Sequence, residues 1–308
     1  MGGGYWTREH FEAYNKARGR KVDKIGAVEG NYNNQEIFHA RKLDKMLDPK
    51  NVMRECCDSQ EHPNTIPVIL ALDVTGSMGY AAVEVAKNLN VIMTNLYDKV
   101  KDVEFMVMGI GDFECDRVPV QISQFESDIR IADQLERIYF EFGGGGNNYE
   151  SYTSAWYMAA RHTSLDCWKR GKKGILITMG DEPLNPYLPL DGRRVTFEEV
   201  TGDKLQAAVE TKELFKEVTG LYDVYHLNVI HSKYHDRRIR PSFMKYLDQD
   251  HYRDTDLNTI SNEITDIVTH AGQAKWQQSQ ALPAGLGRVR NHGRGQGTDR
   301  GRSHGIRW

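Results

Sequence analysis

One apolar stretch, residues 66–73, constrains the fold more than any other part of the sequence. It reads IPVILALD, and its apolar residues run without polar alternation until Asp73. Such a run is typical of a strand that is buried on both faces, as the central strands of a parallel sheet are. After one valine comes the turn TGSMG, whose glycines allow a sharp change of direction before a helix. We therefore expect a buried parallel strand that ends in a loop of oxygen-bearing side chains.

Strands and helices are predicted to alternate after this stretch. The further strands are predicted over 103–112, 118–125, 173–180, 222–230 and near Tyr252, and the helices over 80–99, 127–138, from about 149, 203–218 and 257–270. Only about five residues separate the second strand from the third, too few for a parallel crossover, so the third strand should pair antiparallel at the sheet edge. The alternation predicts an α/β fold with a doubly wound, mainly parallel sheet.

The first 63 residues form a polar leader with short helical patterns. Thr7 can cap a helix that carries Phe11 and Tyr14 on one face, and Asn34 can cap another that ends soon after Leu47. These apolar groups are too few for an independent core. We predict an N-terminal helical extension, residues 1–63, that packs on the main domain or on a partner.

The other end of the chain, residues 272–308, is rich in Gly and Arg. Residues 277–308 contain six Arg and one Asp, so this part carries +5 of the net charge of −3 and the remainder carries −8. With almost no apolar content it is predicted to be a disordered tail, which resembles loosely the Arg/Gly segments that contact RNA. The predicted main domain is therefore residues 64–271.

Cysteine usage and hydropathy indicate a cytoplasmic protein. The four cysteines form no CxxC pair and no recognisable disulfide framework, as expected in a reducing compartment. The sequence has no apolar run of membrane-spanning length, and its first residues lack a signal-peptide core. We expect no membrane contact.

The loop after the first strand carries a carboxylate and two hydroxyls at alternate positions, Asp73, Thr75 and Ser77. Oxygen ligands so placed suit a hard divalent cation such as Mg²⁺. These residues resemble the metal-ion-dependent adhesion site of von Willebrand factor A (vWA) domains, whose signature is Asp-x-Ser-x-Ser with Thr tolerated at either hydroxyl. The resemblance extends over about residues 64–271. It implies a six-stranded sheet in the order 3-2-1-4-5-6 with an antiparallel third strand.

The resemblance also implies ligands from two further loops. In the integrin β type of site the second loop supplies a Glu, and Glu150 has a similar spacing after the Gly-rich loop. The third loop usually reads Thr-Asp-Gly-Glu; here it reads Thr-Met-Gly-Asp-Glu, so the acid is displaced by two positions to Asp181. Asn148 and Ser151 are alternatives to Glu150, and Asp112 could support the site from the second shell. Glu150 could instead be an ordinary acid of a helix's first turn.

An open metal position in vWA proteins is filled by an Asp or Glu of a partner. The implied function is cation-dependent protein binding, as an adaptor or scaffold of bacterial or phage origin, with Mg²⁺, Mn²⁺ or Ca²⁺. No nucleophile and general-base constellation is visible, so we expect no enzyme.

Two alternatives remain open. DVTGS also resembles the phosphorylation loop of haloacid-dehalogenase-type phosphotransferases, in which Asp73 would be the nucleophile. The sequence departs from that pattern at Val74 and Thr75, and Asn185 stands where a second acid is wanted. The other alternative is an RNA-associated protein that binds through residues 277–308.

Overall fold

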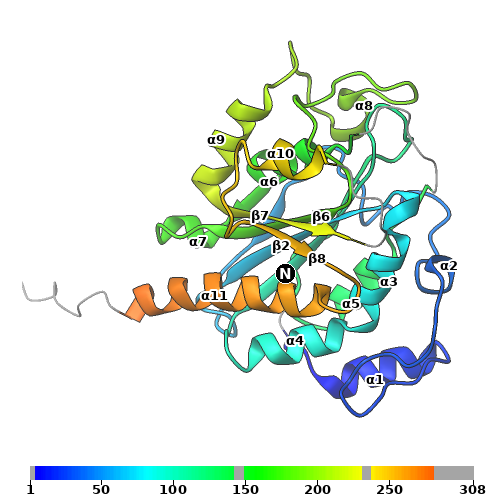
Figure 1. The fold of residues 1–308 in the computed structure, drawn as a ribbon. Coiled ribbons are helices and arrows are strands. Elements are labelled where there is room, and N and C mark those ends of the chain that lie inside the picture. Colours follow the sequence, from blue (N-terminus) through cyan, green and yellow to red (C-terminus); the bar gives the residue numbers. More distant parts are fainter. Residues whose placement is uncertain (1–3, 142–148, 231–236, 281–308) are drawn as a thin grey trace, which may run out of the picture.

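A six-stranded sheet forms the centre of the computed structural model, which describes residues 4–141, 149–230 and 237–280 (Figure 1). The sheet order is β4-β3-β2-β6-β7-β8, and every neighbouring pair is parallel except β3 and β4. Numbered along the chain, these strands give the order 3-2-1-4-5-6 with an antiparallel edge strand, so the predicted fold class is confirmed. The strands are β2 (Ile66–Asp73), β3 (Val103–Ile110), β4 (Val120–Ile122), β6 (Gly174–Gly180), β7 (Tyr222–Val229) and β8 (Tyr252–Thr255).

Both faces of the sheet are covered by helices, as Figure 1 shows. Alternate residues of β2 enter two separate cores: Val68 and Leu70 lie in one, and Ile69 and Ala71 in the other. This two-sided burial explains why the strand has no polar alternation. One face is covered by α3 (Gly79–Lys87), α4 (Leu89–Tyr97), α5 (Arg130–Glu136) and α11 (Ile260–Gln280), and the other by α6 (Tyr152–Arg161), α7 (Asp166–Lys169), α9 (Thr211–Leu221) and α10 (Ile239–Phe243).

The N-terminal extension packs on the main domain. Its helix α1 (Arg8–Ala17) begins at the predicted cap Thr7, and its apolar residues share one core with α4 and α5. Trp6 Nε1 donates a hydrogen bond of 3.0 Å to Asn90 in α4, and Arg20 forms an ion pair of 2.5 Å with Glu136 in α5. The extension also supplies β1 (Arg54–Cys56), which pairs in parallel with β5 (Thr163–Leu165) in a second, two-stranded sheet.

Several predicted boundaries were wrong. The predicted helix 80–99 is divided into α3 and α4 at Asn88, whose side chain donates to the backbone oxygen of Glu84. Helix α2 (Asn34–Ile37) is capped by Asn33 instead of Asn34, because Asn33 forms a capping box with Glu36, and it ends ten residues before Leu47. Helix α9 begins at Thr211, and a short helix α8 (Phe197–Thr201) precedes it.

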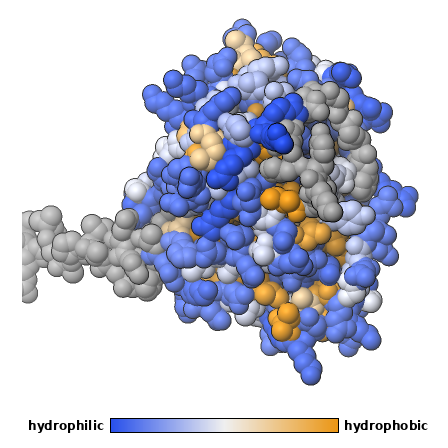
Figure 2. Space-filling view, viewed as in Figure 1, coloured by the Kyte–Doolittle hydropathy of each residue, from blue (hydrophilic) through white to orange (hydrophobic). Residues whose placement is uncertain are grey.

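Hydrophilic residues cover most of the face shown in Figure 2, with small apolar areas between them. Within the described ranges, no helix is long and apolar enough to cross a membrane. The predicted last helix, 257–270, was too short and the predicted tail began too early at residue 272, because α11 continues to Gln280. The remainder of the predicted tail, from residue 281 onward, lies outside the described residues.

Candidate metal site

The site lies where two adjacent parallel strands end. Strands β2 and β6 pair in register from Val68 with Ile175 to Leu72 with Met179. Asp73 is the last residue of β2, and Asp181 directly follows β6. The sheet therefore brings these two acids, more than a hundred residues apart in the sequence, to the same edge.

Asp73 is fully buried, and both of its carboxylate oxygens accept hydrogen bonds. Oδ1 accepts from the backbone N–H of Thr75 at 2.8 Å and from the Thr75 hydroxyl at 2.6 Å. Oδ2 accepts from the Tyr152 hydroxyl at 3.2 Å. These bonds fix the carboxylate at the base of the loop.

Ser77 connects the first loop to the third. Its hydroxyl donates a hydrogen bond of 3.0 Å to Asp181 Oδ1. A hydroxyl that donates its hydrogen to a carboxylate keeps its lone pairs, so the oxygens of Thr75 and Ser77 can both still accept a cation. Ser77 and Gly76 are exposed whereas Asp73 is buried, which leaves the site open to solvent on the Ser77 side.

Glu150 contributes a buried carboxylate near Asp73. Its side chain is 6% exposed, and its Oε2 has no hydrogen-bond partner among the described residues. Burial raises the pKa of Glu150 well above its usual value, and the charges of Asp73 and Asp112 raise it further. A buried carboxylate oxygen without a partner is costly, and a bound cation would satisfy it.

The remaining predicted residues have different positions. Asp112 is buried after β3, and its Oδ1 accepts the backbone N–H of Glu114 at 2.9 Å. The Ser151 hydroxyl accepts the backbone N–H of Phe113 at 2.9 Å, so it fastens the Glu150 loop to the end of β3. Asn148 lies outside the described residues.

Burial dominates the electrostatics of the site, and repulsion between its acids adds to it. Burial and the charge of Asp181 raise the pKa of Asp73 to about 8, against the hydrogen bonds from Thr75 and Tyr152. Burial also raises the pKa of Asp116, next to Asp112, to about 6. Among the described residues, no group of three or more His, Cys, Asp or Glu is by itself arranged to hold a metal ion. Asp73, Glu150 and Asp181 therefore do not by themselves form such a group in this part of the structure.

Sequence reasoning missed Tyr152 and Gly180. Tyr152 is fully buried in the first turn of α6, and its hydroxyl donates to Asp73 Oδ2, whereas Thr75 donates to Oδ1. Gly180 ends β6 beneath it, and a Cβ at this position would lie 1.8 Å from the Tyr152 hydroxyl oxygen. The glycine at the end of the strand, directly before Asp181, could have indicated a close approach by another side chain. Nothing in the sequence indicated that this side chain would be Tyr152.

His226 supports Tyr152 from β7. Its ring stacks on Phe243 at 3.6 Å between centroids and meets the Tyr152 ring edge-on at 5.2 Å. Its Nδ1 lies 3.0 Å from the Thr178 hydroxyl. Burial lowers the pKa of His226 from 6.5 to about 3, so the folded protein holds this ring neutral.

This burial predicts acid sensitivity. Below pH 6.5 the unfolded chain binds a proton at His226 and the folded chain does not, so stability is lost as the pH falls from 6.5 towards 3. Between pH 6 and 4, the free energy of unfolding of the wild type should fall about 1.4 kcal/mol per pH unit more steeply than that of His226→Phe. Urea unfolding of both proteins across this range measures the slopes, and parallel curves would contradict the prediction.

No known protein-family model matches the chain, and no curated protein matches it either. Solved structures resemble it remotely. The pilus adhesin SpaC from Lactobacillus rhamnosus GG, in its open conformation, is 12% identical with a TM-score of 0.47, over 73% of this chain and 31% of SpaC. The vWF domain of the type V pili tip protein Mfa5 from Porphyromonas gingivalis is 10% identical with a TM-score of 0.42, over 72% of this chain and 97% of that domain.

The SpRpn10 VWA domain is 9% identical with a TM-score of 0.38, over 65% of this chain and 95% of that domain. This chain thus spans less than a third of the length of SpaC and nearly all of the two isolated domains. At these identities and TM-scores the likenesses do not extend to ligands or partners, and the fold rests on the strand order described above.

Proposed function

We propose that the chain binds a divalent cation, with Mg²⁺ the first choice, and through it an acidic side chain of a partner protein. The observation that carries the proposal is the buried Glu150 carboxylate, whose Oε2 has no hydrogen-bond partner in the described part of the chain although the charge of Asp73 acts on it. Asp73, Thr75, Ser77, Glu150 and Asp181 would hold the ion, directly or through water. All five offer oxygen, the ligand atom that Mg²⁺, Mn²⁺ and Ca²⁺ take in proteins.

The role of such a cation would be to supply positive charge that the described site lacks. The charge of Asp181 raises the pKa of Asp73, and the charge of Asp73 raises the pKa of Glu150; a cation would offset this repulsion. Because the Ser77 side is open, a partner's carboxylate could reach the ion from solvent. The proposed activity is therefore adhesion of another protein, switched by the metal.

The phosphotransferase alternative finds less support in this geometry. A nucleophilic aspartate needs a carboxylate oxygen that can approach the phosphorus atom. Asp73 is fully buried, and Thr75 and Tyr152 engage both of its oxygens.

Mg²⁺ affinity is expected to rise between pH 6 and pH 8. Asp73, with its pKa at about 8, holds a proton below that pH, and the cation must displace it. The dissociation constant should therefore increase by up to about tenfold for each pH unit below 8. Isothermal titration calorimetry with MgCl₂ at pH 6, 7, 8 and 9 measures this, and equal affinity at pH 6 and 8 would count against a buried carboxylate as ligand.

Partner binding is tested by affinity capture with and without EDTA. The immobilised full chain should retain its protein partner in Mg²⁺ and release it in EDTA, and Asp73→Ala should capture none. Partners that remain bound in EDTA, or that bind Asp73→Ala equally, would show that binding does not depend on the metal.

A further inference from the structure

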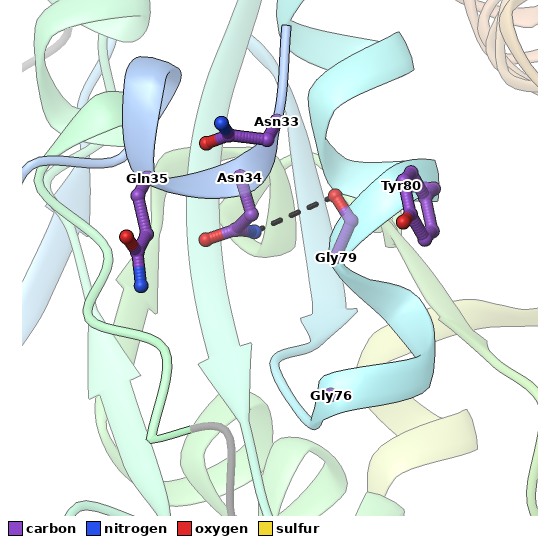
Figure 3. Close-up of a pocket in the computed structure, with 6 residues that line it drawn as sticks. All are labelled: Asn33, Asn34, Gln35, Gly76, Gly79 and Tyr80. Atoms are coloured by element: carbon purple, nitrogen blue, oxygen red, sulfur yellow. Dashed lines mark hydrogen bonds between the residues drawn. The ribbon is translucent and has the colours of Figure 1, made fainter.

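A cavity of about 300 Å³ lies where the N-terminal extension meets the loop of the candidate metal site. Gly76, which lines it, stands between the two hydroxyl residues of that site, Thr75 and Ser77. In Figure 3 the side chains of Gln35 and Tyr80 lie on opposite sides of the hydrogen bond from Asn34 to the Gly79 carbonyl oxygen. The side of Gln35 leads away from the metal loop and along the extension.

A second and larger hollow, of about 540 Å³, lies along the extension; we call it the cationic cleft. One wall comes from residues 34–41 of the extension and the other from residues 139–141 of the main domain. Asn34 and Gln35 line both the cleft and the cavity beside the metal loop. The two hollows therefore adjoin, and a ligand on the metal site can continue into the cleft.

The walls of the cationic cleft are fixed by contacts within the chain. The rings of Phe38 and Phe140, one from each wall, lie 4.7 Å apart between centroids, and both residues are buried. The backbone of Tyr139 donates to Gln121 Oε1 at 2.9 Å and accepts from Gln121 Nε2 at 2.8 Å. A cleft held in this way exists before a ligand arrives, which lowers the entropic cost of binding.

Arg41 and His39 bring exposed nitrogen donors to this cleft. Neither side chain has a hydrogen bond or an ion pair with a described residue. The other arginines of the extension do have partners within the chain, which are Glu12 for Arg8, Glu136 for Arg18 and Arg20, and the Ile122 carbonyl for Arg54. The guanidinium of Arg41 is therefore available to an acceptor from outside the chain.

The lining of the cleft favours a carboxylate over other anions. A guanidinium binds carboxylates and phosphates through paired N–H groups. Glu141 lines the same cleft, and its Oε2 accepts the backbone N–H groups of Arg117 at 2.7 Å and Val118 at 3.3 Å. The negative charge of Glu141 repels a doubly charged phosphate more strongly than a singly charged carboxylate.

We propose that the cationic cleft binds a second acidic side chain of the partner protein, while the first acid completes the coordination of the cation. The partner enters as an extended segment that carries two Asp or Glu residues, and Arg41 pairs with the second of them. The N-terminal extension thereby selects segments with two acids over segments with one. This inference rests on the proposed function, and its failure can be distinguished from the failure of that function.

The test selects random peptides displayed on phage. Peptides of about 12 residues span about 40 Å when extended, long enough to enter both hollows. They are selected on the full chain in Mg²⁺ and eluted with EDTA, and an acid wash then recovers any that EDTA leaves bound. We expect the peptides in the EDTA eluate to share two acids at a constant spacing.

Arg41→Gln should select peptides that share only one acid. Peptides selected on the wild type should bind this variant about fivefold to tenfold more weakly, the loss expected for one charge-assisted hydrogen bond at a partly exposed position. The same peptide with its second acid replaced by the corresponding amide should bind the wild type and Arg41→Gln equally, because the interaction is then absent from both. Mg²⁺ binding without peptide, measured by calorimetry, should be the same in both proteins.

Lys42→Gln is the matched control. Lys42 is exposed next to Arg41 in the sequence and does not line the cleft, so the variant removes the same charge from the same segment. It should select the same doubly acidic peptides as the wild type and bind them equally. An equal loss of affinity in Lys42→Gln and Arg41→Gln would show a general effect of charge and would overturn the assignment of the cleft.

The remaining outcomes separate the two proposals. Peptides that share one acid on the wild type and bind Arg41→Gln with equal affinity would overturn the role of the cleft and leave the metal site intact. Peptides that share no acid, or that only the acid wash releases, would overturn the proposed function and this inference with it.

Discussion

Asp73→Asn is expected to abolish Mg²⁺ binding and yet leave the metal-free protein at least as stable as the wild type. The Asn side chain keeps an oxygen that accepts from Thr75 and gains an N–H directed at the Tyr152 oxygen. It also removes the buried negative charge that Asp181 repels. Loss of the Asp73 carboxylate should weaken Mg²⁺ binding by more than about 100-fold, the upper end of the range for losing a group that supports a metal ligand.

Thermal unfolding at pH 8 with and without MgCl₂ measures both effects. At a Mg²⁺ concentration of 100 times the wild-type dissociation constant, the free energy of unfolding should rise by about 2.7 kcal/mol for the wild type and by no more than about 0.4 kcal/mol for Asp73→Asn. Asp223→Asn is a useful control, because Asp223 lies at the opposite, amino-terminal end of β7. A metal-free Asp73→Asn protein that is clearly less stable than the wild type would mean that the carboxylate serves the fold and not a cation.

Gly180→Ala is expected to destabilise the protein by about 3 kcal/mol, the upper end of the range for overpacking. The new Cβ would lie 1.8 Å from the Tyr152 hydroxyl oxygen and 2.7 Å from its Cζ, which is closer than atoms approach. Tyr152 cannot yield, because it is fully buried against His226 and Phe243. Displacing it should also break its bond to Asp73 and weaken Mg²⁺ binding.

Urea unfolding checks this prediction, with Gly220→Ala as the matched control. A Cβ at Gly220, near the end of α9, meets no atom within 4 Å. The free energy of unfolding of Gly220→Ala should therefore equal that of the wild type or exceed it by up to about 1 kcal/mol. The double variant Gly180→Ala/Tyr152→Phe should recover part of the loss, because it deletes the atom of the closest clash. Equal stability of Gly180→Ala and Gly220→Ala would show that Tyr152 does not occupy this space.

The fold could be predicted because its strongest signals are local. The unbroken apolar run of β2 marked a strand covered on both faces, and the short link before β4 excluded a parallel crossover. Strands β1 and β5 escaped prediction because each has three residues and forms only by pairing across more than a hundred positions. Helix boundaries failed where side-chain contacts decide them, as at Asn33 and Asn88.

The candidate site likewise has residues that the sequence could predict and contacts that it could not. Asp73, Thr75 and Ser77 form a sequence-local pattern, and Asp181 followed from its position at the end of a strand. The Tyr152 contact with Asp73 depends on how α6 is rotated above the sheet, and no local pattern encodes that rotation. The side-chain oxygens of Glu150 and Asn34 that lack a hydrogen-bond partner among the residues described can likewise be recognised only when burial is known.

The pairing of β1 with β5 also governs the order in which the chain can acquire its structure. Arg54 aligns with Thr163, and Trp6 bonds Asn90, so the extension can complete these contacts only after partners much further along the chain have been synthesised. Contacts between such distant positions require the closure of large loops, and the chain loses the entropy of loop closure before the contacts stabilise it. This slows folding. Until those partners are available, the apolar side chains of the extension that pack against α4 and α5 in the folded protein have no core to enter.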